Sequence, residues 1–229
     1  MPVLPGPPPV EITLRRSARS TRFSLRVSRL DGRVTLSLPP RAREAEAMAF
    51  VRAQEGWLRA ALARMALPEA VGIGTVLPVE GRMLRIVPGA GRGVRAEGDA
   101  LVVPGDASLA GARVAGFLKA QARARLVAAS GHYAGLLGVG FSGVTLRDTR
   151  SRWGSCSAAG ALMYSWRLIL APPPVLAYVA AHEAAHLVQM NHSPAYWAVV
   201  ERIYPGWKVP RAWLRAEGQA LHAWRFGGV

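Results

Sequence analysis

The chain has 229 residues, of which 51% are hydrophobic, so it can bury a sizeable core and is not an intrinsically disordered protein. Its net charge of +15 favours anionic partners, and its single cysteine excludes both an intramolecular disulfide and a four-thiolate zinc site. The start of the chain lacks the pattern of a secretory signal, and no apolar run is long enough to span a bilayer, so we expect a cytoplasmic protein without a membrane segment.

The first half of the chain carries mainly β patterns. Residues 1–9 are rich in proline, which predicts a disordered tail. Alternating hydrophobic residues over 10–38 predict a β-hairpin or meander, and apolar residues at helical spacing over 45–65 predict a helix. A second β segment is expected over 76–103. Together these patterns predict an N-terminal β-rich region over 10–105, with antiparallel strands and accompanying helices.

The second half alternates helices with short strands. The predicted elements are a helix over 108–137, strands over 144–146 and 161–170 on either side of a loop over 147–159, a helix that starts after the prolines at 172–174, and a last helix over 211–224. Ser193 is followed by Pro194, and this pair predicts the cap and the first position of one more helix.

Three of the five histidines lie close together in the helix after the prolines and just beyond it. The sequence His182-Glu183-Ala184-Ala185-His186 places two imidazoles four residues apart, on one face of an α-helix, where they can bind one metal ion. His192 lies outside the helical register, so the chain must turn to bring a third imidazole to the ion. Three protein ligands leave one tetrahedral position open, which is typical of catalytic zinc sites.

Glu183 follows the first histidine and therefore lies beside the ion rather than on it. This is the position in which a carboxylate can accept a proton from water at the metal. The alternative is a buried helix with two histidines that only pack. Because the surrounding segment is almost wholly apolar, a buried Glu183 needs a positive partner, and a bound dication would supply one.

The loop Arg150-Ser151-Arg152-Trp153-Gly154-Ser155-Cys156-Ser157 offers two interpretations. As a wall of the metal cleft, Arg150 and Arg152 would bind phosphate or carboxylate, while Gly154 would allow a close approach of the backbone. As a structural turn, it would pack Trp153 in the core. No basic group at a diagnostic spacing activates Cys156, so we interpret it as a small packed residue.

These motifs, together with Trp166-Arg167-Leu168, Tyr178-Val179, Asn191-His192-Ser193 and Tyr196-Trp197, resemble the YgjP-like family of zinc-dependent metallopeptidases, which is similar to the SprT and WLM families. The resemblance is strongest over 144–215. It implies a minimal zincin-like catalytic domain, here over 106–229, with the HExxH helix packed on an antiparallel sheet. It also implies that His182, His186 and His192 bind Zn²⁺ and that Glu183 is the catalytic acid/base.

Two reactions could use this metal site. In peptide hydrolysis, Glu183 would transfer the proton to the leaving amine, and a peptide or protein would be the substrate. In hydrolysis of a nucleoside triphosphate, arginines would neutralise the phosphates. The candidate substrate-binding residues are Arg150, Arg152, Trp153 and Arg167. A nucleic-acid-associated protease or binding protein is a third reading, and it rests on net charge alone.

Overall fold

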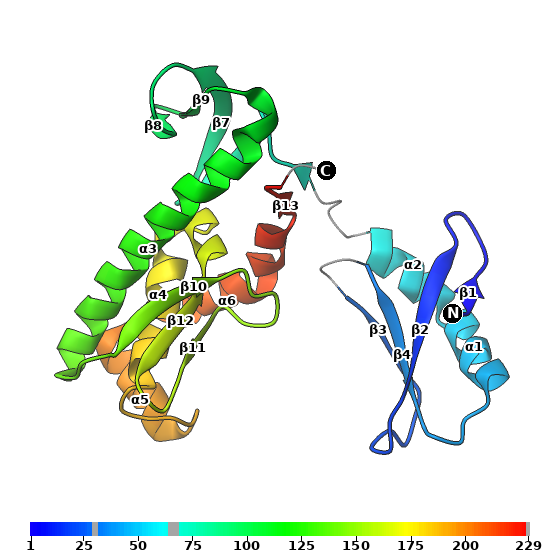
Figure 1. Ribbon diagram of the computed structural model, residues 1–229. Helices are drawn as coiled ribbons and strands as arrows, with labels where there is room; N and C mark the ends of the chain where they lie inside the picture. Colours follow the sequence, from blue (N-terminus) through cyan, green and yellow to red (C-terminus); the bar gives the residue numbers. More distant parts are fainter. Residues whose placement is uncertain (29–31, 64–68, 228–229) are drawn as a thin grey trace. The chain divides into compact units, whose positions relative to one another are not determined.

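The computed structural model describes residues 1–28, 32–63 and 69–227 (Figure 1). The chain divides into two compact units, 1–67 and 68–229, each with a hydrophobic core of its own. The fold is a mixture of α-helices and several small β-sheets, as the sequence predicts. Among the described residues, no helix is both long and apolar enough to cross a membrane.

The first unit consists of one sheet and two helices. Its elements are β1 (Val3–Leu4), β2 (Val10–Arg16), β3 (Ser24–Val27), β4 (Val34–Leu38), α1 (Glu44–Ala53) and α2 (Glu55–Ala63), with strand order β1-β2-β4-β3. Alternate residues of β2 and β4 face the core, so Ile12, Leu36 and Leu38 are fully buried with Val51 and Leu58 of the helices.

Three features of this unit differ from the sequence prediction. Strand β2 pairs with β4 in parallel, whereas β3 pairs with β4 in antiparallel orientation. The proline-rich segment 1–9 contains β1, which pairs with β2, and Arg59 of α2 donates hydrogen bonds to the carbonyls of Pro5 and Pro8. The expected helix is two helices, and its end at 64–65 lies outside the described residues. Alternation has the same period in parallel and antiparallel strands, so it does not determine their direction.

The second unit begins with a four-stranded sheet that packs on a long helix. Its elements are β5 (Glu69–Ala70), β6 (Val76–Val79), β7 (Arg82–Gly89), β8 (Arg95–Glu97), β9 (Ala100–Pro104), the short 3-10 helix η1 (Ala107–Leu109) and α3 (Ala110–Leu137), with strand order β6-β7-β9-β8. Leu77, Ile86 and Leu101 share one core with Val114 and Leu118 of α3. The division of the chain therefore lies before this sheet, whereas the sequence placed a boundary after residue 105; the periodicity of a strand does not say which core it joins.

The remaining elements are the helix that carries His182 and His186 and the strands and helices around it. They are β10 (Gly143–Arg147), β11 (Gly154–Cys156), β12 (Ala161–Ser165), η2 (Trp166–Leu170), α4 (Pro173–Ala185), α5 (Pro194–Ile203), α6 (Lys208–Glu217), η3 (Gly218–His222) and β13 (Trp224–Arg225). Helix α4 contacts α3, strand β11 and both α5 and α6 (Figure 1).

The sheet beside α4 is mixed rather than antiparallel. Its strand order is β10-β12-β11, in which β10 and β12 are parallel and β11 is antiparallel to β12. The sequence predicts a loop where β11 lies, because Gly154, Ser155 and Cys156 have little intrinsic preference for strands. The segment becomes a strand because it pairs with β12. The same pairing places β11 beside helix α4.

Candidate metal centre

Helix α4 is placed by its prolines and by its apolar surface. Pro172 has the extended conformation of an N-cap and Pro173 occupies the first helical position, so the helix begins within the run of prolines rather than after it. The helix is apolar on nearly every side because it lies inside the core, against α3 and β11. Its last turn tightens, since the N–H groups of His186 and Leu187 donate to carbonyls three residues earlier.

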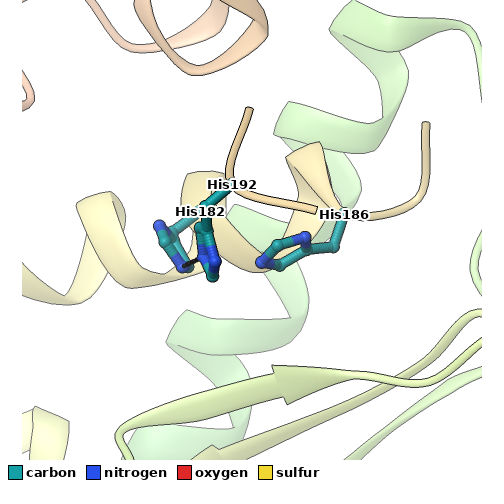
Figure 2. Close-up of side chains that lie close together, drawn as sticks. All are labelled: His182, His186 and His192. Carbon is teal, nitrogen blue, oxygen red and sulfur yellow. Dashed lines mark hydrogen bonds between the residues drawn. The ribbon is translucent and has the colours of Figure 1, made fainter. Parts of the chain in front are cut away.

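The three histidines converge at the end of α4 (Figure 2). Their candidate ligand atoms all lie within 4.8 Å of one another, and Nε2 of His192 is 3.2 Å from Nε2 of His182. His182 and His186 come from the helix, whereas His192 returns from the loop that follows it. The turn that the sequence requires after Asn191 is thus present. Ser193 then caps α5, because its hydroxyl accepts a hydrogen bond from the Tyr196 N–H, which confirms the predicted helix start.

Burial favours the neutral form of the two helix imidazoles, His182 and His186, which is the form that binds a metal. Burial lowers the pKa of His182 to about 3, and the positive charges of His186, His192 and Arg211 act in the same direction. Burial also lowers the pKa of His186, although its contact with the Gln189 carbonyl opposes that effect. In that 2.9 Å contact, Nδ1 of neutral His186 donates to the carbonyl and leaves Nε2 with a free lone pair.

Tyr196 supports the histidines from α5, and the sequence prediction did not assign it a role. Its side chain is fully buried; the ring stacks on His186 with centroids 4.4 Å apart and meets His192 edge-on. Its hydroxyl donates a 2.9 Å hydrogen bond to the carbonyl of His182. One side chain thus contacts all three imidazole-bearing residues. The sequence feature that could have indicated this role is the position of Tyr196, three residues after the Ser193 cap. This position directs its side chain back toward the end of α4.

Glu183 is buried against strand β11. The side chain is only 5% exposed, and its carboxylate lies so near Gly154 that a Cβ there would be 2.5 Å from Oε1. Burial raises the pKa of Glu183 to about 8, against the opposing positive charge of Arg152. A carboxyl group with such a pKa can both accept and return a proton near neutral pH.

The predicted substrate-binding residues lie in two different settings. Arg150 and Arg152 are exposed, and in the described parts of the chain neither belongs to an ion pair. Trp153 is partly buried and stacks on His222 with ring centroids 4.9 Å apart, so the packing interpretation describes it better.

Arg167 is not available to a substrate, and we correct that prediction. Its side chain is buried; Nε and Nη2 donate to the carboxylate of Asp148, and Nη1 donates to the carbonyls of Leu221 and Trp224. Burial raises the pKa of Asp148, but the hydrogen bond and charge of Arg167 outweigh that effect and lower it overall. Arg167 therefore fastens the C-terminal segment to the β10–β11 loop. Sequence spacing could not reveal a partner that lies far along the chain.

The family model described as "YgjP-like, metallopeptidase domain" matches residues 21–217. A solved structure, the crystal structure of the metallopeptidase zymogen of Pyrococcus abyssi abylysin, is 21% identical over 41% of this chain and 93% of that chain, with a TM-score of 0.36. No curated protein matches the chain.

Proposed function

Because the chain belongs to the YgjP-like metallopeptidase family, we propose that it hydrolyses peptide bonds with a zinc ion bound by His182, His186 and His192 and with Glu183 as general base. The observation that carries the proposal is the cluster of three imidazoles at the end of a buried helix, with a buried carboxylate on the residue next to the first of them. Family membership supports a metal-dependent hydrolase, and the identity of the metal and of the base is our inference.

Zinc suits this set of ligand atoms. Three neutral imidazoles are borderline-soft ligands of the kind that zinc prefers, and they leave a coordination position for a reactant. Nε2 of His182 and Nε2 of His192 are 3.2 Å apart, and the ligand atoms of all three histidines lie within 4.8 Å of one another, so His182, His186 and His192 would hold the ion together. When bound, zinc acts as a Lewis acid that acidifies water and polarises a substrate carbonyl.

Glu183 moves the proton in this proposal. Its carboxylate accepts a proton from the attacking water and then donates it to the leaving amine, two steps for which its raised pKa is suited. Gly154 and the surrounding core keep bulk water away from the carboxylate and fix its direction. Tyr196 holds the imidazoles, so that the ligand atoms need little rearrangement before they bind the ion.

One of the arginines on which the nucleotide alternative depends, Arg167, is not available to a substrate in the structure. This alternative relied on several arginines to neutralise phosphates, and Arg167 is held by Asp148 and by two backbone carbonyls. Arg150 and Arg152 remain exposed, but exposed arginines are equally compatible with a peptide substrate. The association with nucleic acid rests on net charge alone. We therefore retain the peptidase as the proposed function.

The experiment compares the wild type with Glu183→Gln, which keeps the shape of the side chain but cannot accept a proton. Each purified protein is loaded with zinc, assayed for metal content and incubated with a peptide library and, separately, with nucleoside triphosphates. We expect about one zinc per chain in both proteins, and turnover of peptides that falls by about 10²- to 10⁴-fold in the variant. Full activity in Glu183→Gln would refute the assigned base, and turnover of triphosphates alone would refute the peptidase.

A further inference from the structure

An aromatic stack leads from the metal centre to a positively charged side chain. Trp197 of α5 lies 5.9 Å, ring centroid to ring centroid, from both His182 and His192. On its other side it stacks on Trp207, with centroids 4.4 Å apart and planes inclined by 21°. The guanidinium carbon of Arg211 lies 4.6 Å from the Trp197 ring and 5.2 Å from the Trp207 ring. Arg211 is thus held beside the histidines by two tryptophans.

The position of Arg211 is fixed by more than the aromatic rings. Arg211 lies in the first turn of α6, and its backbone N–H donates to the carbonyl of Trp207. The side chain is half-buried. A cation–π contact occupies the face of an aromatic ring and uses no hydrogen-bond acceptor, so the N–H donors of Arg211 stay available to an acceptor. A rigid, planar donor of this kind is suited to bind a carboxylate with two hydrogen bonds.

Arg211 has no acidic partner among the described residues. The ion pairs found there involve Arg59, Arg82, Arg95, Arg125 and Arg167. Arg211 nevertheless lies near the site, because the Trp197 ring that it contacts is 5.9 Å from both His182 and His192. A cation beside three metal ligands repels the ion that they bind. An anion that arrives with the substrate would relieve this repulsion.

Arg152 brings a second positive charge to the site from a different element. It lies in the loop before β11, close in sequence to Gly154, whose backbone lies against the carboxylate of Glu183. Like Arg211, it lacks a carboxylate partner in the described part of the chain. Two elements, the loop before β11 and helix α6, therefore each bring an arginine near the proposed site, and only Arg211 is packed on aromatic rings.

We propose that Arg211 is a specificity-determining residue that binds a carboxylate of the substrate beside the metal centre, so that acidic peptides are the preferred substrate class. This inference rests on the proposed peptidase function and narrows it. The two tryptophans hold the guanidinium group of Arg211 in place. A carboxylate of the substrate then supplies the negative charge that Arg211 lacks among the described residues.

The kinetic test uses pairs of peptides that differ only in Asp or Glu against Asn or Gln around the cleaved bond. The variant is Arg211→Gln, which keeps a planar polar group on the tryptophans and removes the charge; the control is Arg215→Gln, an exposed arginine one turn further along α6. We expect Arg211→Gln to lower kcat/KM for acidic peptides by about ten- to a hundredfold. The amide peptides should change less than about twofold, and the control should keep the preference of the wild type. An equal loss on both peptides of a pair would overturn the proposal.

Two further measurements separate this inference from the proposed function. Zinc content should be the same in Arg211→Gln and in the wild type, because the charge is not needed to bind the metal, and thermal unfolding checks that the variant is folded. Binding of labelled acidic and amide peptides to zinc-loaded Glu183→Gln, with and without Arg211→Gln, tests the contact without turnover. If the wild type cleaves no peptide but acidic peptides still bind through Arg211, the peptidase fails and the carboxylate site stands. If acidic and amide peptides bind equally well, or if Arg211→Gln does not change the binding of acidic peptides, the proposed carboxylate site is refuted.

Discussion

The close packing of Gly154 against Glu183, the proposed catalytic base, gives the sharpest prediction. A Cβ at Gly154 would lie 2.5 Å from Oε1 of Glu183, 2.7 Å from Cγ and 2.8 Å from Cδ. Ordinary contact begins at 3.4 Å, so Gly154→Ala requires a displacement of about 0.9 Å at the carboxylate. Glu183 is 5% exposed and has little room in which to swing away. The base is therefore expected to move in this variant.

The expected effects follow from that displacement. A misplacement of about 1 Å can cost on the order of 10²-fold in rate, so kcat/KM of Gly154→Ala should fall by about that factor. Overpacking of a core contact should lower the free energy of unfolding by about 1 to 3 kcal/mol. Zinc content should stay at the level of the wild type, because the atoms nearest to the added Cβ all belong to Glu183, which is not a proposed ligand. Steady-state kinetics, urea unfolding and metal analysis on the same preparations measure the three effects.

Two comparisons make the reasoning refutable. Gly143→Ala adds the same methyl group to β10 of the same sheet, at a position with no neighbouring atom within 4 Å, and should leave activity and stability nearly unchanged. In a Glu183→Ala background the obstructing atoms are gone, so Gly154→Ala should cost little stability there. A penalty that persists in that background, or full activity in the single variant, would show that the carboxylate does not lie where we place it.

Three other substitutions test the surroundings of the site. Removal of the third ligand by His192→Ala should abolish stoichiometric zinc binding in equilibrium dialysis, and an unchanged metal content would show that it is not a ligand. Tyr196→Phe removes the hydrogen bond to the His182 carbonyl, so competition with a chelator should show zinc affinity lowered by about tenfold or more, whereas equal affinity would assign Tyr196 to packing alone. Arg167→Met should lower the free energy of unfolding by about 2 to 4 kcal/mol in urea titrations at pH 7. The folded pKa of Asp148 lies below its ordinary 3.8, so the ion pair stabilises the fold above pH 3.8 and loses this effect as the pH falls through the folded pKa. The difference in the free energy of unfolding between Arg167→Met and the wild type should therefore be smaller at pH 3 than at pH 7. A difference that does not change with pH would contradict this account.

The parts of the site that local spacing determines could be predicted from the sequence. His182 and His186 share a helix face because four residues make about one turn, and Ser193 with Pro194 starts a helix wherever the chain places them. The turn that returns His192 followed from the need for a third ligand. These inferences involve residues within a dozen positions of one another, where backbone geometry leaves few alternatives.

The parts that depend on distant pairing could not be predicted. Strand β11 exists because of its pairing with β12, and only that pairing places Gly154 against Glu183. Arg167 looked available to a substrate because its partners, Asp148 and the carbonyls near the C-terminus, are far away in the sequence. The direction of β2 against β4 is hidden for a similar reason, since alternation is the same in both orientations.

The two ends of the second unit are joined to each other. Strand β13 pairs in parallel with β5; the N–H of Glu69 donates to the carbonyl of Ala223, and that of Val71 donates to Arg225. The same C-terminal segment supplies the carbonyls that Arg167 binds and the imidazole on which Trp153 stacks. Fraying of the C-terminus would therefore release the first strand of the unit and the loop beside helix α4 at once. The C-terminal segment and the loop that carries Trp153 thus belong to one cooperative unit, and the C-terminal segment is not an independent tail.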